Sequence, residues 1–249
     1  MSGSARPRPS SPRPDASEPG WLVEVGRAAL DLVVPQRCAG CGHPGRAWCT
    51  SCAALCAGPS LVVAGTAGCR AAALHSGPAG RAVVAFKDQG TRRLAAPLGD
   101  LLAGAVLDVV ADLELASGEP VWLVPIPARR SARRARGADH MGVLAARAAR
   151  RLRSLGVAAH RCAALGHVRD SLDQVGLDRA QRQANVTGTL RGAPVPPGLL
   201  VVVDDVTTTG ATLAEGIRAL RAVDGRTAAA ATVTWAAPRR HLASEVRRD

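Results

Sequence analysis

The chain has 249 residues, 47% of them hydrophobic, which is enough for one sizeable α/β domain with a small appendage. The formal net charge of +12 favours polyanionic partners, either nucleic acid or phosphorylated small molecules. Aromatic residues make up only 2%, which argues against a base-stacking surface for single strands. The first residues lack a signal-peptide pattern and no apolar run approaches a membrane span, so we expect a cytoplasmic protein without membrane insertion.

The N-terminal region divides by composition. Residues 1–20 are rich in Pro, Ser and Arg and predict a disordered tail. Trp21–Val34 has the apolar spacing of a helix that ends before a proline. We therefore expect a helix plus a small module over 21–66, a main domain over 67–238 and a tail over 239–249.

Two Cys-x-x-Cys pairs follow this helix, and they are separated by seven residues. Each pair can bring two thiolates to one ion, and two pairs complete a tetrahedron, so the spacing predicts a structural zinc site. Disulfides are the poorer explanation in a cytosolic protein. The predicted ligands are Cys38, Cys41, Cys49 and Cys52. The other cysteines, Cys56, Cys69 and Cys162, lack a partner at metal spacing and are interpreted as small buried or semi-buried residues.

The main domain opens with a predicted strand over Ala67–Leu74 and a turn with a short helix over Gly77–Lys87. Thr91 is placed to cap a helix over Arg92–Val110. Lys87 is the only lysine in an arginine-rich chain. A compact charge on a flexible stem suits a phosphate contact, so Lys87 is a candidate for one, and an ordinary surface lysine is the alternative.

Pro120–Pro127 reads as a second buried strand, whose prolines mark a sharp loop. Five arginines crowd residues 128–137 directly after it, before a predicted helix over 138–156. Ligands bind at the carboxyl edge of open α/β sheets, so Arg129 and Arg130 are placed to meet an anion such as pyrophosphate. The alternative is a solvated basic face, and the later arginines of the run can equally meet nucleic acid or solvent.

A third predicted strand, Val157–Leu165, precedes the long polar segment Gly166–Asn185. Such a segment between strands is often a lid that excludes water from a reaction, and a surface helix with a loop is the alternative. A short strand over Thr187–Leu190 follows. The candidate lid residues are Arg169, Gln174, Arg182 and Asn185.

The most informative stretch begins with Leu199–Val203, a continuous apolar run typical of a strand buried on both faces of a parallel sheet. Asp204 and Asp205 follow at the expected end of this strand. Leu213–Val223 is then a predicted helix and Thr227–Trp235 the last strand.

The residues between strand and helix suit a sugar phosphate. Backbone N–H groups at a helix N-terminus favour an anion, while Gly210 and the neighbouring threonines let the chain wrap closely around a phosphate. Asp204 and Asp205 would repel that phosphate if they faced it, but they can accept hydrogen bonds from hydroxyl groups a few ångströms away. A ribose 5-phosphate has both features. The simpler alternative is an acidic cap on an ordinary helix.

This pattern resembles the phosphoribosyl pyrophosphate (PRPP) signature of type I phosphoribosyltransferases. The resemblance implies that Asp204 and Asp205 bind the ribose 2- and 3-hydroxyls as the catalytic pair, and that Mg²⁺ accompanies PRPP. The implied 5-phosphate loop comprises Thr207, Thr208, Thr209, Gly210, Ala211 and Thr212. The implied pyrophosphate loop comprises Ile126, Pro127, Ala128, Arg129 and Arg130.

The strings LVVPQRC, AFKDQGTRRLAAPLG, VPIPARR and HVRDSLDQVGLDRAQRQAN, together with the cysteine pairs, resemble the ComF family. This family groups competence-associated, phosphoribosyltransferase-like proteins linked to bacterial DNA uptake. The resemblance runs from about Val33 to about Trp235. It implies a type I phosphoribosyltransferase-like parallel sheet flanked by helices, with a small N-terminal zinc-binding module.

Three functions remain open at this point. The first is transfer of phosphoribose to an unknown acceptor, a pentosyl glycosyltransferase reaction that releases pyrophosphate. The second is binding of PRPP or a related phosphorylated sugar without turnover. The third is an accessory role in which a basic surface binds single-stranded DNA.

Overall fold

The computed structural model describes residues 36–66, 68–88, 90–116, 118–128, 139–168, 187–224 and 228–238. The chain divides into two compact units, Met1–Gln36 and Arg37–Asp249, and the described helices and strands all belong to the second. Several sequence predictions lie outside the described residues: the N-terminal tail and helix, the C-terminal tail, Arg129, Arg130, Arg169, Gln174, Arg182 and Asn185.

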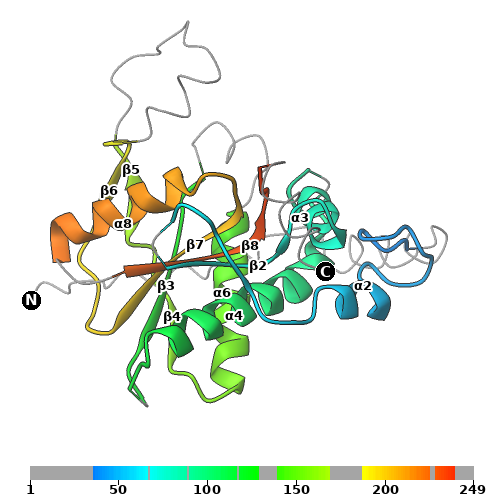
Figure 1. The fold of residues 1–249 in the computed structure, drawn as a ribbon, viewed down its shortest axis with the longest axis horizontal. Coiled ribbons are helices and arrows are strands. Elements are labelled where there is room, and N and C mark those ends of the chain that lie inside the picture. Colours follow the sequence, from blue (N-terminus) through cyan, green and yellow to red (C-terminus); the bar gives the residue numbers. More distant parts are fainter. Residues whose placement is uncertain are drawn as a thin grey trace, which may run out of the picture. The chain divides into compact units, whose positions relative to one another are not determined.

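A six-stranded sheet forms the centre of this unit, in the order β1-β2-β8-β7-β3-β4 (Figure 1). β1 pairs antiparallel with β2, and the other neighbouring strands are parallel. The predicted α/β fold with a mostly parallel sheet is therefore confirmed. The strands are β1 (Leu61–Val62), β2 (Cys69–Leu74), β3 (Val121–Pro125), β4 (Ala159–Arg161), β7 (Leu199–Thr207) and β8 (Ala228–Trp235).

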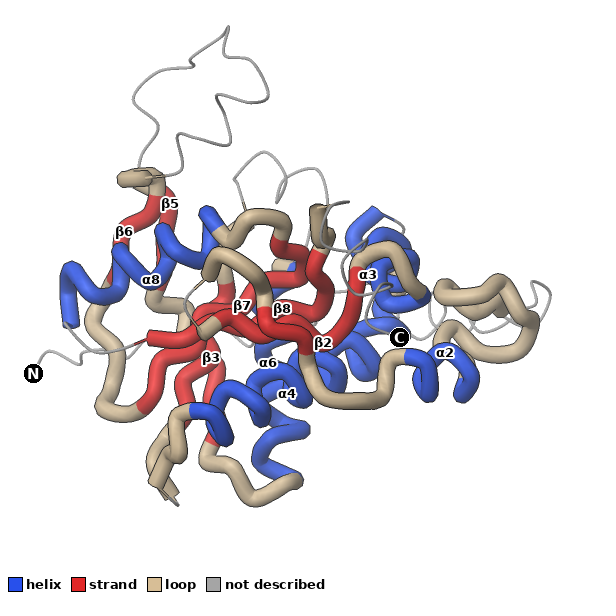
Figure 2. Tube along the Cα trace, viewed as in Figure 1, coloured by secondary structure: helices blue, strands red, loops and turns tan. Residues whose placement is uncertain are grey.

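Helices cover both faces of the sheet (Figure 2). Residues of α4 and α6 pack with Val201 and Val203 of β7, whereas residues of α8 pack with Leu200 and Val202. This division follows from the alternation of side chains along a strand. The helices are α2 (Thr50–Leu55), α3 (Pro78–Asp88), α4 (Ala95–Asp112), α6 (His140–Ser154) and α8 (Ala211–Asp224).

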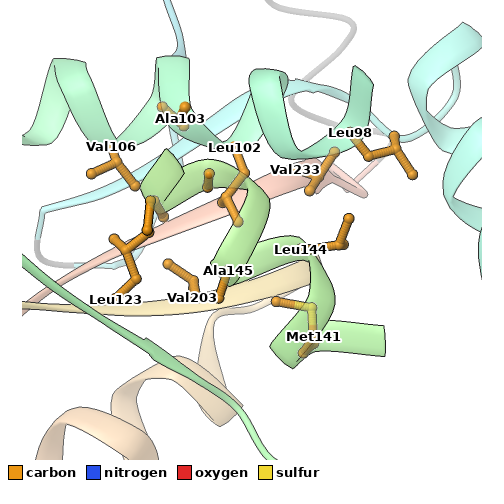
Figure 3. Packing of buried hydrophobic residues seen from close by; sticks show 14 of the residues in the cluster. Leu98, Leu102, Ala103, Val106, Leu123, Met141, Leu144, Ala145, Val203 and Val233 are labelled. Atoms are coloured by element: carbon orange, nitrogen blue, oxygen red, sulfur yellow. The ribbon is translucent and has the colours of Figure 1, made fainter. Parts of the chain in front are cut away.

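The larger core lies between α4, α6 and the sheet. Leu102 of α4, Leu144 of α6, Val203 of β7 and Val233 of β8 belong to one buried cluster there (Figure 3). Each of these four side chains is fully buried. Aliphatic residues dominate this core, as the low aromatic content predicts, and Phe86 is the one aromatic residue among its buried members.

The helix α4, with the 3₁₀ turn Arg92–Leu94 before it, corrects one sequence prediction. Among the described residues, Arg92–Asp112 is by length and composition apolar enough to cross a membrane, although no such run was expected. Half of its most apolar stretch is buried inside the protein. A core helix that packs on a sheet needs the same composition as a membrane span, which explains the overlap. Thr91 also makes no capping hydrogen bond from its side chain, contrary to prediction.

The predicted strand Val157–Leu165 is wrong as one element. Its first part is β4 of the main sheet, and its last residue begins β5 (Leu165–His167), which pairs antiparallel with β6 (Leu190–Gly192) in a separate two-stranded sheet. The strand predicted over Thr187–Leu190 accordingly begins at Leu190. Val168 N–H donates to Thr189 O at 3.0 Å, which extends this pairing beyond the strand ends.

Candidate sugar-phosphate site and metal centre

The two predicted binding loops leave the sheet from neighbouring strands at the same edge. β3 and β7 are parallel with Pro125 opposite Val203, and Ile126 N–H donates to Val203 O at 2.9 Å. Because parallel strands end at a common edge, Ile126–Ala128 emerges beside Asp204. The structure therefore brings these two segments together.

The strand β7 is longer than predicted, because its pairing with β8 continues to Thr207 opposite Trp235. Both acids therefore lie within the strand and not after it. Trp235 Nε1 donates to Thr208 O at 3.1 Å, and Ala236 N–H donates to Thr207 O at 2.8 Å. These bonds fix the start of the loop, while the side chains of Thr208 and Thr209 are exposed.

Gly210 ends the loop with a φ of +78°, the left-handed region that glycine adopts at low cost. A Cβ atom at this position would lie 2.1 Å from Thr66 Cγ2, in the turn between β1 and β2. α8 begins at Ala211, and the N–H groups of its first turn have no partner within the helix. The loop thus presents exposed threonines and unpaired amides in one place, which is the composition of an anion site.

The two acids lie on opposite faces of β7, as adjacent residues of a strand do. Asp205 is 6% exposed, and its Oδ1 lies 2.6 Å from Lys87 Nζ on α3. Asp204 Oδ1 accepts the N–H of Asp205 at 2.9 Å. Lys87, predicted as a phosphate contact, therefore contacts an acid of the site in this structure.

The two carboxyl groups differ in their preferred charge. Burial and the neighbouring Asp205 carboxylate raise the pKa of Asp204 to about 8, although the Asp205 N–H and the Lys87 ammonium oppose the shift. Part of the Asp204 surface remains exposed, but protein surrounds the group closely enough for desolvation to dominate. Asp204 therefore favours its protonated form more than an ordinary aspartate does, whereas Asp205 forms an ion pair with Lys87.

His75 joins this group of residues, and the sequence analysis missed it. His75 Nδ1 lies 3.0 Å from Thr234 Oγ1, which in turn donates to Asp205 O at 3.2 Å. Burial and the Lys87 ammonium lower the pKa of His75, and the Asp205 carboxylate opposes this shift. The signal was available, because His75 directly follows a predicted strand whose end lies at the same sheet edge as the acids.

The segment predicted as the pyrophosphate loop is described as far as Ala128. Ile126 is buried, whereas Pro127 and Ala128 are partly exposed. His167 of β5 lies with its Nε2 2.9 Å from Pro127 O, so the two-stranded sheet contacts this segment directly. His167 is not among the predicted site residues, because it falls within the polar segment Gly166–Asn185 that is predicted as a lid.

The four predicted metal ligands do converge. Their sulfur atoms all lie within 4.8 Å of one another. Cys38 Sγ and Cys52 Sγ are 3.7 Å apart, and Cys41 Sγ and Cys49 Sγ are 3.6 Å apart. A tetrahedron with Zn–S bonds of about 2.3 Å has edges of about 3.8 Å, so the thiols have the spacing of a metal site. We call these residues the Cys₄ cluster.

The environment of the Cys₄ cluster favours negative charge on only some of its sulfurs. Burial raises the pKa of Cys38, but this pKa falls to about 6 because the sulfur accepts hydrogen bonds from the N–H groups of Cys49, Cys41 and Gly40. Burial and the neighbouring thiols raise the pKa of Cys52. Successive thiolates repel one another unless a cation compensates them, so this donor set fits a dipositive ion. The other cysteines are buried or partly buried, as predicted.

A scan against protein-family models found no match, and a search of curated proteins found no matching relative. The interpretation of the site therefore depends on its residues and their geometry.

Proposed function

We propose that this chain is a PRPP-binding protein of the type I phosphoribosyltransferase class, and that it is of the ComF type its sequence resembles. One observation carries the proposal. An acid pair, a loop with exposed hydroxyls and a helix N-terminus follow one another at the end of β7, beside the segment that leaves β3. A phosphate, a diol and a pyrophosphate need these three kinds of environment side by side.

In this proposal the 5-phosphate lies on the loop Thr207–Thr212 and receives hydrogen bonds from its amides and hydroxyls. The ribose hydroxyls contact Asp204 and Asp205, and the pyrophosphate lies near Ile126–Ala128. Mg²⁺, when bound, would neutralise charge on the phosphates and would be held mainly by them, with the ionised forms of these two carboxyl groups as candidate protein ligands among the described residues.

For a transferase, the chain would contribute position and electrostatics. A lone pair of the acceptor nitrogen forms the new bond to ribose C1 while the bond from C1 to pyrophosphate oxygen breaks. Pyrophosphate leaves with the electron pair, and the acceptor loses its proton to a base or to water. Asp204 and Asp205 would hold the ribose in the reactive orientation, and the amides of the loop would fix its phosphate.

We also propose that the Cys₄ cluster binds structural zinc. Four thiols at tetrahedral spacing leave no open coordination position, which supports a structural role over a catalytic one. The N–H groups of Cys49 and Cys52 donate to Sγ atoms of the cluster at 3.4 Å each, as bonds that orient metal-bound thiolates do. Only the ComF resemblance supports a role in DNA uptake or processing, and we include it in the proposal on that basis.

The test is calorimetric titration of Mg²⁺–PRPP into the purified protein beside the isosteric double variant Asp204→Asn/Asp205→Asn. Asp100→Asn, on the exposed side of α4, is the matched control for loss of a carboxylate. We expect saturable binding to the wild type and to the control, and at least tenfold weaker binding to the double variant, about the effect of losing a hydrogen bond to a charged group. Equal affinities would exclude the acid pair from the site. No binding to the folded wild type would refute the PRPP proposal and redirect the search to nucleic-acid phosphates.

A further inference from the structure

A cavity lies between the Cys₄ cluster, α3 and the end of β2, where His75 connects it to the candidate site. Its volume is about 460 Å³, within the range of about 300–1,000 Å³ typical of small-molecule sites. Four polar residues line it, namely Arg37, His75, Arg81 and Thr91, together with small apolar side chains of the metal-binding segment and α3. Among the described residues that line the cavity, none is a carboxylate, although the metal-ligand candidate Cys38 also lines it. The guanidinium groups of Arg37 and Arg81 are the charged donors there that suit an anionic group of a ligand.

The backbone of the metal-binding segment holds Arg81 in place. Arg81 Nε donates to Gly40 O at 2.5 Å, and its two Nη groups have no hydrogen-bond partner among the residues that the structure describes. Gly40 itself packs tightly on the cluster, because a Cβ atom there would lie 2.6 Å from Cys52 Sγ. The Cys₄ cluster thus fixes the carbonyl that orients Arg81. A guanidinium held by Nε presents its remaining edge to a carboxylate or phosphate.

The hydrogen bonds of His75 determine what its ring offers to a ligand. The Thr234 hydroxyl has one hydrogen, which it donates to Asp205 O, so the Thr234 oxygen must accept from His75 Nδ1. The neutral ring therefore carries its proton on Nδ1, which leaves Nε2 as an acceptor. Because burial and Lys87 lower the pKa of His75, this neutral form prevails at neutral pH.

We infer that this cavity binds an anionic nitrogen heterocycle, with its carboxylate or phosphate on Arg81 and Arg37, an N–H group donating to His75 Nε2, and its ring against the small apolar side chains. The identification of this ligand as the acceptor rests on the proposed function. Its physical basis is the connection from His75 through Thr234 to Asp205, which places the cavity next to the proposed ribose position. In this proposal the segment that carries the Cys₄ cluster has a role besides metal binding, because it forms one wall of the acceptor site.

The experiment measures orotate and uracil binding to the full-length, zinc-loaded protein without PRPP, by calorimetry or ligand-observed NMR. The two compounds share a ring with N–H donors, and only orotate carries a carboxylate. We expect saturable orotate binding and at least tenfold weaker uracil binding, about the effect of one charge-assisted hydrogen bond. Arg81→Met should weaken orotate binding by a similar factor. The matched control Arg150→Met, on the exposed face of α6, should leave it unchanged.

A second pair of variants tests His75. His75→Gln retains an acceptor oxygen and should keep most of the orotate affinity, whereas His75→Phe should lose it. Zinc content and circular dichroism confirm that each variant is folded, and Arg37→Met replaces Arg81→Met if the latter is not. Absence of saturable orotate binding, equal orotate and uracil affinities, or an unchanged affinity in the arginine variants would overturn the inference. PRPP binding, measured separately on the same samples, distinguishes the two proposals, since orotate binding without PRPP binding would refute only the proposed function.

Discussion

The close contact between Gly210 and Thr66 leads to a quantitative prediction about the phosphate loop. Gly210→Ala forces an L residue into a left-handed conformation, which costs about 1–2 kcal/mol. It also places a methyl group 2.1 Å from Thr66 Cγ2, and overpacking of this kind costs about 1–3 kcal/mol more. Thr66→Ser removes that Cγ2 atom while it retains the hydroxyl that donates to Val63 O at 2.6 Å. The next nearest atom to the new Cβ is then Thr66 Cβ, at an ordinary 3.4 Å.

Urea denaturation of the wild type, the two single variants and the double variant measures the coupling energy between Gly210→Ala and Thr66→Ser. We expect Gly210→Ala to lower the free energy of unfolding by about 2–5 kcal/mol in the wild-type background but by only about 1–2 kcal/mol in the Thr66→Ser background. The difference is the energy of the steric clash. An equal cost in both backgrounds would refute the placement of the β1–β2 turn against the loop. PRPP titration of the folded variants would show whether the same contact positions the loop for its ligand.

Three further predictions concern charge and metal. Cys52→Ser, or a strong chelator, should release zinc, measured by metal analysis, and lower the thermal unfolding midpoint, measured by calorimetry. An unchanged zinc content together with an unchanged midpoint would refute a structural metal. The raised pKa of Asp204 implies stability that is present at low pH and lost as pH rises between about 4 and about 8, with a slope of up to about 1.4 kcal/mol per pH unit. Urea denaturation of Asp204→Asn across this window should show a flatter dependence, and an unchanged slope would contradict it. Lys87→Met should lower the free energy of unfolding by about 3 kcal/mol, because it leaves the buried Asp205 carboxylate without its cationic partner. The double variant Lys87→Met/Asp205→Asn should recover much of that loss in the same urea denaturation assay. No recovery would count against the ion pair.

The sequence predicts those elements that are indicated by consecutive or closely spaced residues. The apolar run Leu199–Val203 identified the central strand, and the cysteine spacing identified four thiols that do converge. Both signals arise because burial and metal geometry constrain consecutive or closely spaced residues. The helix over 138–156 is observed with Asp139 at its N-cap, where its side chain accepts the Gly142 N–H. Such local contacts can be inferred without knowledge of the tertiary fold.

The features that the sequence did not predict depend on tertiary partners. β7 continues through the acids because β8 pairs with it, and no property of Asp204 or Asp205 signals that pairing. Lys87 is unusual in the sequence as the only lysine, but its contact with Asp205 depends on α3 packing against β2 and β8, the latter being the neighbour of β7. The split of Val157–Leu165 between two sheets likewise follows from which strands are available to pair. A propensity pattern indicates that a segment is extended, and it does not indicate its partner.

Two acids next to a phosphate loop would repel the phosphate if both carried a full negative charge. The raised pKa of Asp204 favours its protonated form, and the Lys87 ammonium compensates the charge of Asp205. Together these effects lower the negative charge of the acid pair below the two charges that the sequence alone suggests. A phosphate on the neighbouring helix N-terminus therefore meets its N–H groups with weaker repulsion from the acids. The oxygens of both carboxyl groups remain chemically able to accept hydrogen bonds from a diol, so the repulsion decreases without loss of the hydroxyl-binding groups.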